Sequence, residues 1–170
     1  MQSLKREPDR IHEQHEIDKI YLVQLRLICT IAGLYYAFIT ITHFFFLPVD
    51  ILLPVAGTSA LTSVLALMVR QLASGKRLSP QKSHYAFVPV AASILITIFT
   101  HIFLSGDQMQ LTNAILAQYA FGLVVLVPRI FALFTTFWVL ASIAALALIP
   151  GETTIHFSFM LAGALVLSIL

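Results

Sequence analysis

Six continuously apolar runs make up most of the 170-residue chain, and polar connections separate them. The runs cover residues 27–46, 51–69, 85–104, 111–127, 130–149 and 155–170. The hydrocarbon core of a bilayer is about 30 Å thick, so a helix that rises 1.5 Å per residue needs about 20 residues to span it. The first, third and fifth runs reach that length. The second and fourth runs are slightly shorter.

These runs predict α-helices rather than β-strands. Their apolar residues follow one another without alternation, and a segment in lipid must satisfy its own backbone hydrogen bonds. Pro48, Pro54, Pro128 and Pro150 lie at or near run ends, where a helix can begin or stop at little cost. The pattern therefore predicts an all-α, polytopic bundle of six transmembrane helices over residues 27–170.

Residues 1–26 differ from the rest, because they are polar and carry charges of both signs. They lack the short cationic start and apolar core of a secretory signal. Residues 9–26 contain no Gly or Pro, and their apolar positions have a rough helical spacing. We expect this N-terminal segment to be a helix that leads directly into the first span.

Composition agrees with a membrane protein and excludes a soluble domain. Hydrophobic residues make up 59% of the chain and charged residues 11%, with a mean hydropathy of +0.91. Too few polar side chains remain to cover a water-exposed surface. The single cysteine, Cys29, lies in the first run, so no disulfide can form within the chain.

Basic and acidic residues alternate between the connections. Lys and Arg occur in the N-terminal segment, within residues 70–82 and at Arg129, whereas the other connections carry Asp50, Asp107 and Glu152. Cationic connections stay in the cytoplasm. The pattern predicts a multi-pass membrane protein with its N-terminus inside. Attraction to anionic lipid explains the basic residues better than binding to nucleic acid does.

The last run reaches Leu170 with no polar or basic residue after it. We expect the chain to continue into a cytoplasmic domain, so that these residues are one module of a longer protein. The alternative is a short natural terminus.

Three isolated histidines, His43, His101 and His156, are predicted about one helical turn from the outer face. The acidic residues of the outer connections, Asp107 among them, lie just beyond these rings. Such a layer can bind a transition metal, hold haem b through His43 and His101 as axial ligands, or sense protons. The alternative is that each imidazole only reaches for the membrane interface.

Polar residues inside the runs suggest a second feature. Asn113 and Gln118 are five positions apart, or about 140° around a helix, so they need not face the same partner. Each can hydrogen bond to a neighbouring helix. Alternatively, Asn113 and Gln118 belong to a polar pocket in the outer leaflet. The other candidates for that pocket are Tyr35, Tyr36, Thr40, Thr97, Thr100 and Thr112.

The fifth run combines Trp138, expected to pack inside the bundle, with a face of small residues. These are Ala141, Ala144, Ala145 and Ala147. A smooth face allows close helix contact, either within the chain or in a homodimer. Walker, HExxH, GxSxG and CxxC motifs are absent, so the sequence predicts no enzyme within these residues.

Residues 101–113 read H-I-F-L-S-G-D-Q-M-Q-L-T-N, and Gly122 and then V-P-R-I-F follow. This stretch resembles a pattern of bacterial membrane-anchored signalling proteins, roughly H-L-x-L-T-G-D-P-x-Q-T-x-N. His101, Gly106, Asp107, Gln110, Thr112 and Asn113 look like its members. Gln108 replaces the usual Pro, and Leu111 separates Gln110 from Thr112.

In that family a six-helix region precedes a diguanylate cyclase (GGDEF), a class III nucleotide cyclase or a histidine kinase. The resemblance implies a sensory, dimer-forming input module whose sixth helix relays a stimulus to a cytoplasmic output domain. A small transporter and a haem-carrying membrane protein are the rival hypotheses. The chain has no internal repeat and no acid or base in the middle of a run, which counts against a transporter.

Overall fold

The computed structural model describes residues 6–75, 77–125, 127–149 and 154–169, and the regular structure in these ranges is entirely helical. The helices are α1 (Arg6–Phe46), α2 (Val49–Ser74), α3 (Ser83–Ala86), α4 (Val88–Ser105), α5 (Leu111–Val124), α6 (Pro128–Leu148) and α7 (Thr154–Ile169). Two single 3₁₀ turns, η1 (Pro80–Lys82) and η2 (Gln108–Gln110), lie in the connections. The predicted all-α class is therefore confirmed.

Among the described residues, four helical stretches are long and apolar enough to cross a membrane, which indicates a membrane protein. They are Glu16–Phe46, Val49–Ser74, Pro80–Ser105 and Pro128–Leu148. Two further apolar helices, Leu111–Val124 and His156–Leu167, are shorter. The 14 residues of α5 extend about 21 Å, less than the core of about 30 Å.

Local chemistry explains where the helices end. Residues 9–32 contain no Gly or Pro, so α1 runs on from the polar N-terminal segment into the first apolar run. Pro48 stops that helix and precedes α2, and Pro128 occupies the first turn of α6. Gly106 ends α4 in the left-handed conformation (φ 63°), with its N–H donating to the Ile102 carbonyl at 3.1 Å.

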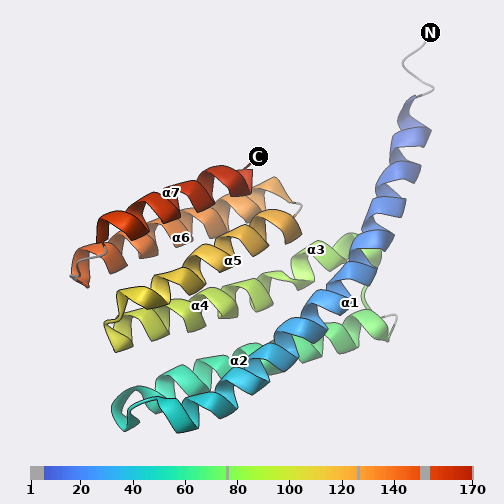
Figure 1. Ribbon diagram of the computed structural model, residues 1–170. Helices are drawn as coiled ribbons and strands as arrows, with labels where there is room; N and C mark the ends of the chain where they lie inside the picture. Colours follow the sequence, from blue (N-terminus) through green and yellow to red (C-terminus); the bar gives the residue numbers. More distant parts are fainter. Residues whose placement is uncertain (1–5, 76, 126, 150–153, 170) are drawn as a thin grey trace.

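The helices form a chain of neighbours (Figure 1). α1 and α2 make an antiparallel hairpin, α2 packs on α4, and α4 packs on α5. α5 in turn contacts both α6 and α7. Leu25, Leu95, Ile102, Leu111 and Trp138 are among the fully buried side chains of the core. Trp138 was predicted to pack inside the bundle, and its 2% exposure confirms this.

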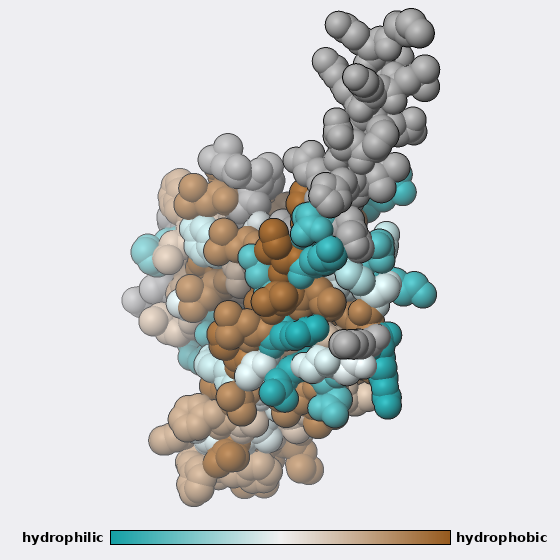
Figure 2. All heavy atoms as spheres, turned by 90° about the vertical axis from the view of Figure 1, so that its right-hand side faces the viewer, coloured by the Kyte–Doolittle hydropathy of each residue, from teal (hydrophilic) through white to brown (hydrophobic). Residues whose placement is uncertain are grey.

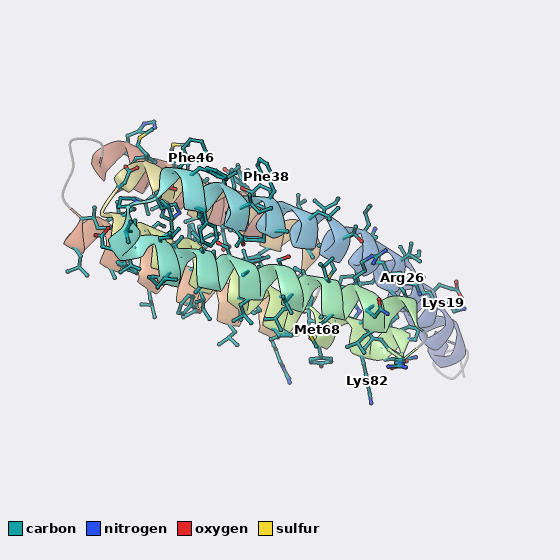
Figure 3. The ribbon with its side chains drawn as sticks, turned by 90° about the horizontal axis from the view of Figure 1, so that it is seen from below. Lys19, Arg26, Phe38, Phe46, Met68 and Lys82 are labelled. Carbon is teal, nitrogen blue, oxygen red and sulfur yellow. The ribbon has the colours of Figure 1, made fainter. Side chains whose placement is uncertain are left out.

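Hydrophilic side chains gather among apolar ones on the end of the bundle that faces the viewer in Figure 2. Lys19, Arg26 and Lys82 lie toward this end in Figure 3, while Phe38 and Phe46 lie along the other part of α1. The remaining surface is dominated by exposed apolar residues. Examples are Phe38, Leu53, Leu133, Leu140 and Phe159, each more than 60% exposed. Such an apolar surface suits lipid and not water.

Buried polar contacts tie α1 to the connection between α2 and α4 at the hydrophilic end. Nε2 of His84 lies 3.1 Å from Oδ1 of Asp18, and the His84 ring stacks on Tyr21 with centroids 4.1 Å apart. Nε of Arg26 donates to the Ala73 carbonyl at 3.0 Å, in the last turn of α2. A cation at a helix C-terminus is favourable, so this bond holds α1 beside α2.

Candidate functional site: a pocket between α1, α4 and α5

A pocket of about 600 Å³ lies between α1, α4 and α5. Its apolar wall includes Ile28, Ile31, Ala32, Ile94, Leu116, Ala120, Phe121 and Val124. Its polar wall consists of Tyr35, Tyr36, His43, Thr97, His101, Gln110 and Asn113. The volume falls within the range of small-molecule sites, roughly 300–1,000 Å³, and the mainly apolar lining with a few polar groups is typical of them.

His43 and His101 come together at one end of this pocket. α1 and α4 bring the two rings into edge-to-face contact, with centroids 5.5 Å apart and planes at 82°. His43 is 7% exposed, and its Nδ1 lies 3.5 Å from Oγ of Ser59 on α2. The contact confines both rings, and both residues line the pocket.

Asp107, Gln110 and Asn113 form a line of hydrogen bonds where α4 turns into α5. Nδ2 of Asn113 donates to Oε1 of Gln110 at 3.0 Å, and Nε2 of Gln110 lies 3.5 Å from Oδ2 of Asp107. The other Asp107 oxygen accepts from the Met109 N–H at 2.9 Å. Asp107 thus organises the turn, and Gln110 and Asn113 present amides to the pocket.

Buried hydroxyl groups on α2 hydrogen bond to α1 and α4, the two helices that form part of the pocket wall. Oγ1 of Thr97, on the pocket wall, lies 2.9 Å from Oγ1 of Thr62 on α2. Oγ of Ser63 donates to the Gly33 carbonyl on α1 at 2.8 Å. Both bonds are buried and join α2 to its two neighbours, so α1 and α4 are held at a defined separation on the α2 side.

Several predicted residues lie elsewhere. Thr112 is exposed and does not line the pocket, and the same holds for His156 on α7, whose ring contacts Phe157 instead. Gln118 is fully buried and faces away, since its Nε2 donates to Oγ1 of Thr135 on α6 at 3.1 Å. Glu152 lies outside the described residues. Of the three histidines predicted to form one layer, His43 and His101 are therefore in contact, and His156 lies apart from them.

Of the three histidines predicted to bind a metal, two, His43 and His101, line the pocket. Among the described residues, no three His, Cys, Asp or Glu side chains are grouped so that they could hold a metal ion. A structural zinc site takes four ligands and a catalytic one takes three. Ligation of haem b by His43 and His101 needs only two and stays a prediction.

Sequence patterns singled out the polar wall but not the residues that create the space. Ala32 on α1 and Ala117 and Ala120 on α5 line the pocket. Because Ala117 and Ala120 are three positions apart, they share one helix face. That spacing was a signal in the sequence, but small residues more often mark close helix contact than a hollow.

The chain matches no protein-family model, and no curated protein or solved structure shows significant similarity to it. Functional inference therefore rests on the pocket. Its imidazole, amide and hydroxyl groups can hydrogen bond as donors and as acceptors. The described residues that line it include no Lys, Arg, Asp or Glu. This arrangement suits the binding of a small molecule with hydrogen-bonding groups.

Proposed function

We propose that this chain is the membrane-embedded sensory module of a bacterial signalling protein, with the pocket between α1, α4 and α5 as its input site. The observation that carries the proposal is the convergence of His43, His101 and Asn113 on one hollow. Two of these, His101 and Asn113, belong to the stretch that resembles the signalling family. The proposal assigns no catalysis to these residues.

The helix contacts support a route from the pocket to an output domain. α5 forms one wall of the pocket, and it packs against α7 along much of its length. Nε1 of Trp138 on α6 donates to the Ala114 carbonyl of α5 at 2.8 Å, and this buried bond ties α6 to α5. A ligand that prefers one separation of α1 and α5 would shift the population of states, and α7 would pass that shift to a cyclase or kinase.

The proposal includes six spans, a cytoplasmic N-terminus and an inner-membrane location. The clustering of Lys19, Arg26 and Lys82 at one end of the bundle supports this orientation, because basic residues stay inside. Six spans require α5 and α7 to cross despite their length, with local thinning of the bilayer compensating for the mismatch. A homodimer, formed in the membrane, would pair the output domains.

A reporter fusion tests the sensory role. We would join the chain at Leu170 to the catalytic domain of a diguanylate cyclase and measure the cyclic dinucleotide that cells produce. Ala120→Trp fills the pocket from α5, whereas Ala132→Trp adds the same bulk to an exposed position on α6 outside the pocket. We expect a change in output of threefold or more for Ala120→Trp and none for Ala132→Trp. Equal output from both variants would contradict the proposal.

A further inference from the structure

The pocket is long and has a polar and an apolar end. Its lining on α1 runs from Ile28 to His43, which is about 22 Å of helix. His101, Gln110 and Asn113 accompany His43 at one end, because α4 finishes and α5 starts there. Phe87 and Val124 lie at the other end, where α4 starts and α5 finishes. Tyr35, Tyr36 and Thr97 line the middle, so the lining is apolar at the Phe87 end and polar toward the other end. An occupant must therefore be apolar at the Phe87 end.

The charge of the lining restricts the polar group of that occupant. No Lys or Arg among the described lining residues can pair with a phosphate or carboxylate. The Asp107 carboxylate lies near this end but outside the lining, and it already accepts from Gln110 and from the Met109 N–H. A charged group buried without a partner is costly. The available groups are two imidazoles and two amides, which both donate and accept hydrogen bonds. They suit an uncharged hydroxyl or carbonyl head and disfavour phospholipids.

The volume restricts the rest of the occupant. A helix 10–12 Å across and about 22 Å long occupies roughly 1,700–2,500 Å³. The pocket holds about 600 Å³, so it cannot enclose a whole helix of that length. It suits one narrow chain. Ile31 and Leu116 on its opposite walls are each 60% exposed, so the pocket opens sideways toward lipid.

We infer that the pocket binds a single-chain amphiphile with an uncharged, hydrogen-bonding head. The head lies against His43, His101 and Asn113, and the hydrocarbon tail lies along Ala32 and Phe121. The ligand enters from the outer part of the bilayer between α1 and α5. This inference rests on the proposed function, because it names the class of molecule that the input site receives.

Photo-crosslinking of the purified 170-residue chain in lipid nanodiscs tests this inference. Three probes share one C16 tail with a diazirine and differ in the head: monoacylglycerol (neutral), fatty acid (anionic) and alkylammonium (cationic). We expect the neutral probe to label at least tenfold more than either charged probe. The label should be saturable, should compete with unlabelled monopalmitoylglycerol, and should map to residues 28–39 and 116–124.

Matched variants separate the pocket from the general lipid surface. Asn113→Leu removes an amide from the polar end at an exposed position, and Thr112→Val changes the adjacent exposed residue outside the lining. We expect labelling by the neutral probe to fall at least fivefold in Asn113→Leu and in Ala120→Trp. It should stay within twofold of the wild type in Thr112→Val and Ala132→Trp. Elution as a single species in gel filtration verifies that each variant is folded.

Each other outcome would overturn a defined statement. Equal labelling by all three probes, or equal labelling of the wild type and Ala120→Trp, would mean that the probes contact the protein as ordinary lipid and do not bind in the pocket. A preference for a charged probe would contradict the uncharged head. The neutral probe could label saturably and selectively while monopalmitoylglycerol has no effect on the output of the cyclase fusion. That result would support the binding site and contradict only the sensory role.

Discussion

The imidazole rings of His43 and His101 meet edge to face with their centroids 5.5 Å apart, although the two residues are 58 positions apart in the sequence. Ser59 borders the pair on α2, and Asn113 and Gln110 complete the same end of the pocket. This pair is both a packing contact and the polar end of the candidate site, and the two roles can be separated by mutation.

Replacement of His43 by Phe keeps an aromatic ring against His101, whereas replacement by Ala removes it. Aromatic pairs contribute about 0.5–1.5 kcal/mol beyond the area that they bury. We therefore expect the free energy of unfolding of His43→Ala to be lower than that of His43→Phe by about 0.5–1.5 kcal/mol or more. Reversible unfolding in mixed micelles, followed by circular dichroism, measures the difference. Equal stability would mean that the rings do not pack against each other in solution.

The two histidines are also the residues to test for a cofactor. Since the described part of the chain groups no third His, Cys, Asp or Glu with them, we expect less than 0.2 equivalents of zinc or copper in the purified protein. Metal analysis and an absorption spectrum check this together. A Soret band that disappears in both His43→Phe and His101→Phe would instead establish the haem hypothesis.

Two glycines in the middle of helices predict opposite effects of the same substitution. A Cβ at Gly33 would lie 2.7 Å from Cγ and Cδ2 of Leu67, whereas a Cβ at Gly57 has no heavy atom within 4 Å. Gly57→Ala should stabilise the protein by about 0.5–1 kcal/mol through helix propensity. Gly33→Ala should destabilise it by about 1 kcal/mol or more, because Leu67 must move.

The double variant Gly33→Ala/Leu67→Ala provides the control for this pair. If the clash is the cause, removal of the Leu67 side chain should make the Gly33 substitution harmless or favourable. The same unfolding assay measures both effects. A stabilising Gly33→Ala in the presence of Leu67 would contradict the close approach of α1 and α2 at this point.

Cysteine labelling in cells tests the six-span topology, and the short helix α5 is its critical point. Cys29 is fully buried, so a Cys29→Ala background removes it without loss of an exposed group. We expect Met109→Cys to react with a membrane-impermeant maleimide from outside. Ser79→Cys and Val127→Cys should react only after permeabilisation. Reaction of Val127→Cys from outside would mean that α5 does not cross the membrane.

Much of the fold was predictable, because local properties of the chain determine it. Continuous apolar runs require helices in lipid, and Pro48, Gly106 and Pro128 mark helix ends through their own backbone restrictions. A proline also explains the break near the start of the run at residues 85–104. Its helix is interrupted at Phe87, beside Pro89, so that α3 and α4 are distinct. Pro89 lacks the N–H that an unbroken helix would use.

The candidate site was only partly predictable. Position along a run sets the depth of a residue in the membrane, and on that basis His43, His101 and His156 were placed in one layer. Depth does not set the direction in which a side chain points around its helix, nor which helices are neighbours. The packing of α1 and α4 on α2 turns His43 toward His101, and it leaves His156 on α7 exposed.

By itself, the sequence determined that this is a helical membrane protein, because hydrophobicity and backbone restrictions act within each segment. Only the tertiary structure decided that Asn113 faces the pocket while Gln118 bonds to Thr135 on α6. Likewise, the hollow beside Ala117 and Ala120 depends on how far apart α1 and α5 are held. That separation is set by contacts between distant helices, such as the Thr62–Thr97 and Ser63–Gly33 bonds, which no single segment of the sequence contains.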